Sequence, residues 1–434
     1  MRSATGIASR RAALSILGQV RAGRSFETAL DRGVGTLDEP DRRLAHELAA
    51  GVLRQRSVLD EQLAPLVARG WDSVAAELQD ILRMGAYQLT ALERVPPHAA
   101  VDTSVALAKA AGGERAAGFV NAILRRLTYT ERSPRAGVEG NASSLAAEYS
   151  HPLWLVQRWL GTFGHSGTEG LLRWNNTRPR LTLQPAREEL TAMGHKWRSE
   201  GIEAEPAAFG AGLITNRRRP VDLPGYQEGH FIVQDSAQAL LVRFADPPEG
   251  GLIYDACAAP GGKTIALGRG AATIVAGEVS PMRARRLAEN LARAGSGREH
   301  VLVADARHPP LRPMDLVLLD APCLGTGTFA RHPDARWRVT PEALASLVQL
   351  QTELLEGAAD VVAPGGLLVY STCSLEPEEN LQQVDDFLTR HPEFGREPGG
   401  AVPASLLSPE GDLTILPQHH GMDGAYGARL RRIA

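Results

Sequence analysis

The stretch "GLIYDACAAPGGKT", residues 251–264, joins a short apolar run to a glycine-containing turn that leads into a helical pattern. Four more apolar runs of strand length follow along the chain: "TIVAGEV", "HVLVADA", "LVLLDAP" and "GGLLVYSTC". Amphipathic patterns such as "RARRLAENLARAG" separate most of these runs. Because strands and helices alternate, residues 236–434 are predicted to form a doubly wound α/β domain on a parallel sheet.

Residues 1–135 have a different pattern. Apolar side chains recur there at the three-to-four spacing of amphipathic helices and no strand pattern is found, so a helical bundle is predicted. One helix is expected to begin at Pro96 and Pro97 and to end at Gly112 and Gly113. In the helix that follows, one apolar stripe is expected to face the core: Phe119, Val120, Ile123, Leu124 and Leu127.

Two segments lie between these regions. Residues 136–144 belong to a polar stretch without periodicity and are predicted to be a linker. Residues 145–235 mix helical patterns with the short strands "RLTLQP" and "HFIVQD", which indicates a small α/β module. A chain of 434 residues is also too long to fold around one ordinary hydrophobic core. The protein is therefore expected to be multidomain, with a bundle, a small module and an α/β domain.

The composition excludes several classes of protein. With 43% hydrophobic and 22% charged residues the chain is globular, and its net charge of −3 leaves room for local basic patches that bind nucleic acid. Three widely spaced cysteines argue against a disulfide framework and for a reducing cytoplasm. The N-terminus is predicted to be an amphipathic helix, not a signal peptide. Neither a metal cluster nor a membrane-spanning run is found, so no metal and no membrane association are expected.

Chemically distinctive residues follow the predicted strands. Cys257, Cys323 and Cys373 each come shortly after one, where loops begin. In doubly wound sheets, ligands bind beyond the carboxyl ends of the strands, so a common site is expected there.

The loop "DACAAPGGKT" matches neither the dinucleotide fingerprint nor the P-loop pattern. Glu278, Asp305 and Asp320 end the next three strands, and a carboxylate after the second strand commonly accepts hydrogen bonds from ribose hydroxyls. Each acid by itself could equally be a loop cap. Together with a single glycine-rich loop, they favour a nucleoside cofactor without a pyrophosphate, which points to S-adenosylmethionine.

Three blocks, "DACAAPGGKT", "LLDAPCLGTGTFARHPDARW" and "YSTCSLEPEEN", resemble the signatures of RNA 5-methylcytosine methyltransferases of the RsmB/NOP family. The bacterial 16S ribosomal RNA branch of that family is the most similar. The helical N-terminus, "GFVNAILRRL" above all, resembles the RNA-binding protein NusB. The resemblance implies a NusB-like RNA-binding domain over 1–135 and a Rossmann-like class I methyltransferase domain over 236–434. It also implies 16S ribosomal RNA as the partner; we expect a cytoplasmic monomer.

The resemblance assigns roles as well. Cytosine carbon 5 is a poor nucleophile until a thiolate adds to carbon 6, which is covalent catalysis. Cys373 is then the nucleophile, Cys323 helps to release the product, Asp320 binds the base near nitrogen 3, and Lys263 lies between loop and base. The implied S-adenosylmethionine contacts are Cys257, Ala258, Ala259, Pro260, Gly261, Gly262, Lys263, Glu278, Asp305 and Asp320.

Several alternatives stay open at this point. DNA 5-methylcytosine enzymes use a Pro-Cys cysteine as the nucleophile, which would make it Cys323, and both thiols could simply be buried apolar residues. The α/β domain could be an inactive scaffold behind an RNA-binding bundle, or the substrate could be DNA or transfer RNA. Cys257 itself is expected to be a packed residue of the cofactor loop.

Other residues raise more local questions. The loop "ARHPDARW", with Arg331, His332, Asp334, Arg336 and Trp337, could contact phosphate or stack on a base, or could place Trp337 in the core. Arg125 and Arg126 are candidate RNA contacts. The chain departs from the family at Glu278, where Asp is common, at Leu324, where a small hydroxyl residue is usual, and at Tyr426, the single aromatic left in the block "DGAYGARL".

Overall fold

The structure, a computed structural model, describes residues 6–129, 141–215 and 219–433. The chain forms two compact units: Met1–Thr177 with Phe329–Arg338 is unit 1, and Arg178–Thr328 with Val339–Ala434 is unit 2. This division differs from the predicted one, because the first helix expected in the small α/β module, "PLWLVQRWLGTF", belongs to unit 1. The predicted domain boundaries remain a proposal.

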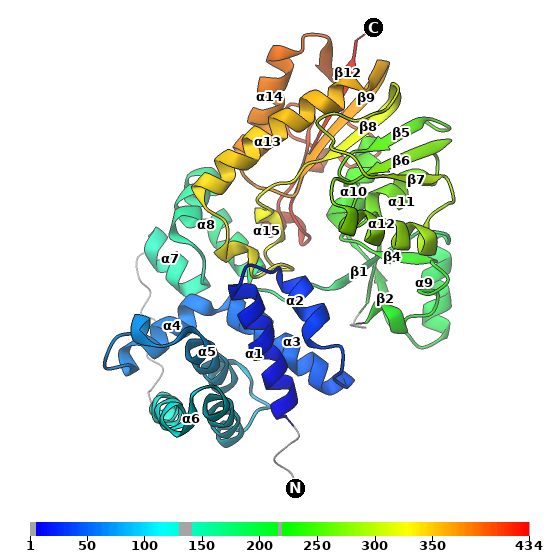
Figure 1. Cartoon of the computed structure of the whole chain (residues 1–434). Helices are drawn as coiled ribbons and strands as arrows, with labels where there is room; N and C mark the ends of the chain where they lie inside the picture. Colours follow the sequence, from blue (N-terminus) through cyan, green and yellow to red (C-terminus); the bar gives the residue numbers. More distant parts are fainter. Residues whose placement is uncertain (1–5, 130–140, 216–218, 434) are drawn as a thin grey trace. The chain divides into compact units, whose positions relative to one another are not determined.

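The described residues of unit 1 form helices and the loops that connect them, without a strand (Figure 1). Side-chain caps fix several helix starts: Ser25 accepts a hydrogen bond from the backbone of Thr28, and Asp38 from that of Asp41. The helices are α1 (Ile7–Arg21), α2 (Phe26–Gly33), α3 (Glu39–Arg54), α4 (Arg56–Leu63), α5 (Ala76–Ala91), α6 (Pro97–Tyr129), α7 (Ala142–Tyr149) and α8 (Leu153–Asn175).

Helix α6 breaks at a glycine pair, as predicted. Gly112 and Gly113 have non-helical backbone angles, and Gly113 adopts φ of 72°, a region that other residues rarely enter. Beyond the break, the predicted stripe faces inward: Val120, Ile123 and Leu124 are buried, and the two remaining members pack against the same core.

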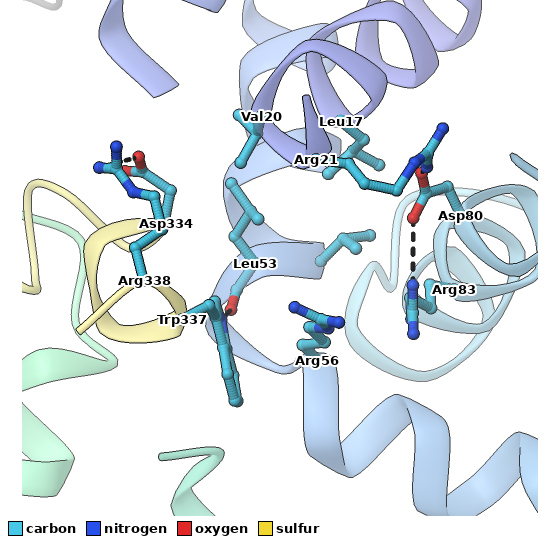
Figure 2. Close-up of a pocket in the computed structure, with 11 residues that line it drawn as sticks. Leu17, Val20, Arg21, Leu53, Arg56, Asp80, Arg83, Asp334, Trp337 and Arg338 are labelled. Carbon is cyan, nitrogen blue, oxygen red and sulfur yellow. Dashed lines mark hydrogen bonds and ion pairs between the residues drawn. The ribbon is translucent and has the colours of Figure 1, made fainter. Parts of the chain in front are cut away.

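The segment Phe329–Arg338 returns to unit 1 from the α/β part of the chain and is anchored there (Figure 2). The guanidinium of Arg336 is fully buried and donates to the Asn176 side chain and the Asn175 carbonyl, each at 2.7 Å. The indole N–H of Trp337 donates to the carbonyl of Leu53 at 2.8 Å. Phosphate contact by this loop is left open by the sequence; the guanidinium of Arg336 already donates to protein oxygen atoms.

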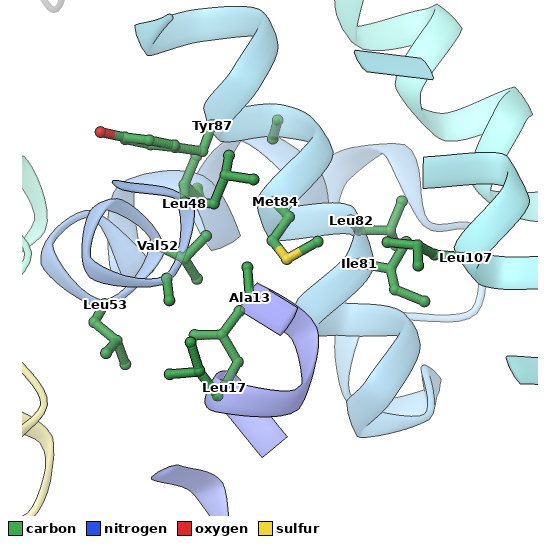
Figure 3. Packing of buried hydrophobic residues seen from close by; sticks show 14 of the residues in the cluster. Ala13, Leu17, Leu48, Val52, Leu53, Ile81, Leu82, Met84, Tyr87 and Leu107 are labelled. Carbon is green, nitrogen blue, oxygen red and sulfur yellow. The ribbon is translucent and has the colours of Figure 1, made fainter. Parts of the chain in front are cut away.

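The core of the bundle forms where α1, α3 and α5 meet (Figure 3). Leu48 and Val52 of α3 pack with Ile81 and Met84 of α5, and none of the four is more than 2% exposed. Burying a side chain of this size contributes about 1.5–3 kcal/mol. Packing of this face, more than helix propensity, therefore holds the bundle together.

Unit 2 begins with a four-stranded antiparallel sheet of order β2-β3-β1-β4. Trp197 of α9 (Leu190–Ser199) packs edge-on against Phe231, with ring centroids 5.2 Å apart. Strands β1 and β4 were predicted, whereas the three-residue β2 and β3 are too short to leave a pattern. The strands are β1 (Leu181–Pro185), β2 (Ala204–Pro206), β3 (Leu213–Thr215) and β4 (Phe231–Val233).

The larger sheet has the order β10-β12-β9-β8-β5-β6-β7, with β11 paired to β12. Strands β5 to β9 are parallel, as predicted, but β12 pairs antiparallel with β9, β10 and β11. The sheet is therefore mixed, because β12 runs opposite to its neighbour β9. Its strands are β5 (Leu252–Asp255), β6 (Thr273–Gly277), β7 (Glu299–Leu302), β8 (Met314–Asp320), β9 (Val362–Thr372), β10 (Phe394–Arg396), β11 (Leu413–Ile415) and β12 (Ala425–Arg432).

Helices cover both faces of this sheet (Figure 1). Along β8, Val317 and Leu319 point into the cluster under α13 and α14, whereas Leu316 and Leu318 point into the cluster under α10 and α11. Both faces are thus buried, which explains the uninterrupted apolar run of this strand. The helices are α10 (Ser236–Ala245), α11 (Gly262–Gly268), α12 (Pro281–Ala294), α13 (Pro341–Asp360), α14 (Leu381–Arg390) and α15 (Pro417–His420).

Candidate active site

The predicted polar residues gather at the carboxyl edge of three neighbouring strands, β9, β8 and β5. Asp320 is the last residue of β8 and pairs with Ser371 of β9. Cys373 directly follows β9, Cys323 follows β8, and Lys263 lies in the first turn of α11 after β5. The prediction that these side chains share one edge is confirmed by this topology.

Two cysteines meet at this edge. The sulfur atoms of Cys323 and Cys373 are 3.4 Å apart, and both thiols are free and partly buried. The turn after Cys323 is held against the second cysteine, because the backbone N–H of Gly327 donates to the carbonyl of Cys373 at 3.0 Å. A Cβ atom on Gly327 would lie 2.8 Å from that oxygen. Glycine is therefore needed here for the close approach of the two loops.

An ion pair lies beside the thiols. The ammonium of Lys263 donates to the Asp320 carboxylate at 2.6 Å, and the hydroxyl of Ser371 donates to its other oxygen at 3.0 Å. Burial by itself would lower the pKa of Lys263, but the negative charges of Asp320, Asp255 and Cys373 raise it. Lys263 is therefore a fixed positive charge at neutral pH.

The two thiols have different electrostatic surroundings. The hydrogen bond to Cys373 and burial hold the pKa of Cys323 well above its usual value, and the charge of Glu379 raises it further. Cys373, in contrast, interacts with the Lys263 cation. The Lys263 cation therefore acts on Cys373, and the Glu379 carboxylate acts on Cys323.

Glu379, in the block "EPEEN", supports the Cys323 loop. Its fully buried carboxylate accepts from the backbone N–H of Leu324 at 3.0 Å and from the side-chain amide of Gln351 at 2.9 Å. That amide also donates to the carbonyl of Pro322 at 2.9 Å. Both residues flanking Cys323 are thereby held. Sequence reasoning used the block for its resemblance but assigned no role to this acid.

Asp255, at the end of β5, is a second acid that sequence reasoning missed. It is fully buried and accepts from the hydroxyl of Thr264 at 2.7 Å, which ties the strand to α11. Burial raises the pKa of Asp255 to about 6. Its other carboxylate oxygen has no hydrogen-bond partner in the described structure. The sequence feature that could have identified Asp255 is its position at the end of a strand, directly before the glycine-rich loop.

The predicted cofactor loop turns tightly between β5 and α11. Gly261 adopts φ of 106°, where a side chain would be strained, and the N–H of Ala258 donates to the carbonyl of Gly277 at 2.9 Å. Within this loop, Cys257 packs partly against the core, and burial raises the pKa of its thiol to about 12. The geometry thus agrees with the packed role expected for Cys257.

Glu278 and Asp305 differ in how firmly they are held. Glu278 directly follows β6 and is 2% exposed; its carboxylate accepts from the backbone N–H of Ser280 at 2.9 Å. Asp305 lies three residues beyond β7 and not at its end. The guanidinium of Arg307 binds both of its oxygens and lowers the pKa of Asp305. Asp305 is thus already paired within its own loop.

An apolar surface lies next to Glu278. Val279 is 63% exposed and Val303 is 54% exposed. They follow the ends of two neighbouring strands, which are joined by a hydrogen bond from the N–H of Glu278 to the carbonyl of Leu302. Met282, in the first turn of α12, is also exposed. A buried carboxylate beside exposed apolar side chains suits a ligand with a polar sugar and a flat base.

Two departures from the family pattern have structural explanations. Leu324 is buried, with 7% exposure, and only its backbone N–H takes part in the network of Glu379. Tyr426 is buried in β12, where its hydroxyl donates to Asp412 at 2.5 Å and its ring lies edge-on to Tyr370. Both side chains are therefore core residues.

The described ranges offer neither a metal site nor a membrane-spanning helix. No group of three or more His, Cys, Asp or Glu side chains there is arranged to hold a metal ion. Within the same ranges, none of the helices has the length and apolar character that crossing a membrane requires.

Comparison with known proteins identifies both parts of the chain. The profile described as "16S rRNA methyltransferase RsmB/F" matches residues 242–431, and that of the NusB family matches residues 7–129. A Synechocystis protein called "Probable ribosomal RNA small subunit methyltransferase B" is 34% identical and covers 98% of this chain and 100% of its own length. The "Ribosomal RNA small subunit methyltransferase B" of Vibrio vulnificus is 33% identical over 97% of this chain and 98% of its own.

Solved structures agree on the fold. The crystal structure of PH0851 superposes with a TM-score of 0.83 at 25% identity and covers 98% of both chains. NSun6 from Pyrococcus horikoshii, solved "with SFG", has a TM-score of 0.57 at 19% identity over 64% of this chain and 97% of its own. Identity above 30% over nearly the full length of both chains is the decisive finding. The chain belongs to the RsmB/F family of 16S ribosomal RNA methyltransferases.

Proposed function

We propose that this methyltransferase modifies carbon 5 of a cytosine in 16S ribosomal RNA through a covalent adduct between Cys373 and carbon 6. The observation that carries the proposal is the contact between two thiols, 3.4 Å apart, beside the ion pair of Lys263 and Asp320. Two cysteines are needed because addition of a thiol and its later departure are separate steps. The names of the two relatives, both called small-subunit ribosomal RNA methyltransferases, support the small-subunit RNA as substrate.

Each side chain has a distinct task in this proposal. Cys373 adds to carbon 6 as the thiolate, which makes carbon 5 nucleophilic. Asp320 hydrogen-bonds the base near nitrogen 3, and Lys263 holds that carboxylate in place at 2.6 Å. After methylation, carbon 5 loses its proton and the Cys373 sulfur departs. Cys323, once its own thiol proton has left to solvent, accepts that proton as a base, and the electron pair of the broken C–H bond re-forms the double bond between carbons 5 and 6 as the Cys373 thiolate leaves.

The methyl donor is proposed to be S-adenosylmethionine, which supplies the methyl group when bound. The buried carboxylate of Glu278 would accept hydrogen bonds from the ribose, and the exposed side chains of Val279, Met282 and Val303 would contact the adenine. The backbone from Cys257 to Gly262 would line the methionine end. Asp305 would first have to share its carboxylate with Arg307, so we assign it a smaller contribution.

The domain functions are proposals as well. The NusB-like residues 1–135 would bind RNA, residues 136–144 would link them to the module of residues 145–235, and residues 236–434 would carry out the reaction. Arg125 is exposed and remains a candidate RNA contact. Because the proposed substrate is ribosomal RNA, we place the protein in the cytoplasm, and we expect it to act as a monomer.

Trapping with 5-fluorocytidine tests the proposal. A 16S transcript that contains this base should form a conjugate with the wild type, stable to denaturing electrophoresis, because fluorine at carbon 5 cannot leave as a proton. Bisulfite sequencing of an unmodified transcript after reaction should reveal one protected cytosine. A scaffold without activity would give neither result. A protected cytosine in transfer RNA or DNA, and not in the 16S transcript, would contradict the choice of substrate.

A further inference from the structure

A cavity in unit 1 has a lining that suits an anionic, aromatic ligand (Figure 2). Its volume is about 270 Å³, and its walls come from α1, α3, α4, α5 and the Phe329–Arg338 segment, all parts of unit 1. Four arginines and two aspartates line it, which leaves the charged lining with a net charge of +2. The remaining lining is apolar apart from the indole of Trp337.

The two aspartates of the lining are already neutralised. Asp80 forms ion pairs with both Arg21 and Arg83. Asp334 pairs with Arg338 at 2.7 Å and accepts from the backbone N–H of Phe26. Among the described residues of the lining, neither carboxylate therefore forms a direct ion pair with the fourth arginine.

That fourth arginine is Arg56. Within the described part of the chain it makes no hydrogen bond and no ion pair, and its guanidinium lies over the Trp337 ring, 5.3 Å from the centroid. Partial burial and the neighbouring Arg83 lower the pKa of Arg56, whereas the charges of Asp60 and Asp80 raise it. The residue as a whole is exposed, so an anion can reach its guanidinium.

Trp337 gives the cavity a fixed flat wall. Its indole N–H donates to the carbonyl of Leu53 at 2.8 Å, which sets the orientation of the ring. Figure 2 shows Arg56 directed toward this ring and the ion pair of Asp334 with Arg338 nearby. A guanidinium on an aromatic ring is a surface on which unpaired bases stack.

We infer that this cavity binds one unpaired nucleotide of the RNA substrate, with its phosphate at Arg56 and its base against the Arg56–Trp337 pair. Arg21 and Arg338 keep their charges partly exposed, at 44% and 43%, and can contact the neighbouring phosphates. The volume is slightly below the ~300–1,000 Å³ of small-molecule sites, which suits one nucleotide and excludes a duplex. This inference rests on the proposed function, since it takes RNA as the substrate.

The test uses the full-length protein and an in vitro transcript of 16S ribosomal RNA. Arg56→Gln should weaken binding by on the order of tenfold and lower the slope of log K against log salt by about one, the effect of one lost phosphate contact. Arg56→Lys should keep the slope but lose part of the affinity, because an ammonium does not stack as a planar guanidinium does. The loss should be found in KM for the transcript and not in kcat.

Matched variants separate the cavity from general charge. Arg115→Gln removes the same charge from an exposed position of unit 1 outside the lining and should bind like the wild type. Trp337→Phe keeps a stacking ring, whereas Trp337→Leu should bind more weakly. Thermal melting of each variant checks that unit 1 remains folded.

The outcomes distinguish this inference from the proposed function. If the wild type methylates the transcript but Arg56→Gln keeps the wild-type affinity and salt slope, the cavity is not a nucleotide site. Equal losses in Arg56→Gln and Arg115→Gln would also overturn it, since they indicate charge alone. If the wild type neither binds nor methylates the transcript, both proposals fall together.

Discussion

The sulfur atoms of Cys323 and Cys373 lie 3.4 Å apart, although each cysteine follows a different strand of the sheet. Their surroundings are not equivalent, because Glu379 faces the first thiol and Lys263 the second. The proposal assigns nucleophilic attack to Cys373, and mutagenesis can decide between it and Cys323.

The two cysteine variants should fail in different ways. Cys373→Ala should form no conjugate with any RNA, because no thiolate reaches carbon 6. Cys323→Ala should still attack and methylate, then stall before release, so a conjugate with unmodified RNA should accumulate on denaturing gels. A conjugate from Cys373→Ala, or none from Cys323→Ala on 5-fluorocytidine RNA, would reverse the assignment.

Glu379 should act by positioning the Cys323 loop. Glu379→Ala removes the acceptor of Leu324 and of Gln351, so we expect kcat to fall roughly 10- to 100-fold, the range for a misplaced reacting group. The affinity for S-adenosylmethionine, measured by calorimetry, should not change. Glu379→Gln keeps an acceptor oxygen and should recover part of the rate, and Glu378→Ala serves as the control. Equal rates for the two alanine variants would exclude the positioning role.

Glu278 should account for part of the cofactor affinity. We expect Glu278→Ala to weaken S-adenosylmethionine binding by about 1–3 kcal/mol, as for the loss of hydrogen bonds to a charged group. Glu289→Ala removes the same charge from an exposed position of α12 and should bind normally. Calorimetry that finds wild-type affinity in Glu278→Ala would place the ribose elsewhere.

Asp255 should make stability depend on pH. Its pKa is raised from 3.8 to about 6 in the folded state, so the folded protein holds this proton more tightly than the unfolded chain does. Raising the pH through this window removes the proton at a cost, and the free energy of unfolding should fall by up to about 3 kcal/mol from this group. Denaturant titrations of wild type and Asp255→Asn should therefore diverge between pH 4 and 6.

The exposed Asp386 of α14 provides the control for that comparison. Asp386→Asn should follow the wild type across the whole range, because it removes a carboxyl from the surface and not from the core. If Asp255→Asn also follows the wild type, the buried carboxyl is stabilised by interactions that offset its burial.

The parts of the fold that depend on local patterns could be predicted. Strand β8 and the break of α6 at Gly112 and Gly113 follow from an apolar run and from a glycine pair, both visible in the sequence. The antiparallel strand β12 could not be predicted, because its pairing with β9 joins residues far apart in the chain. The same limit applies to the site. Cys323 and Cys373 were found by their motifs, whereas Glu379 is defined by contacts to Leu324 and Gln351 that no spacing reveals.

The return of Phe329–Arg338 to unit 1 has a consequence for synthesis on the ribosome. About 150 residues of unit 2 are translated after Thr177 and before Phe329. At ~5–20 residues per second, this takes roughly 8 to 30 s. During that interval Arg336 and Trp337 have not yet been synthesised. The carbonyls of Asn175 and Leu53 therefore lack the hydrogen bonds that these two side chains donate to them in the folded protein. The N-terminal helices are thus synthesised first, but unit 1 is complete only after residue 338 has been translated. A fragment that ends at Thr177 lacks the Phe329–Arg338 segment of unit 1.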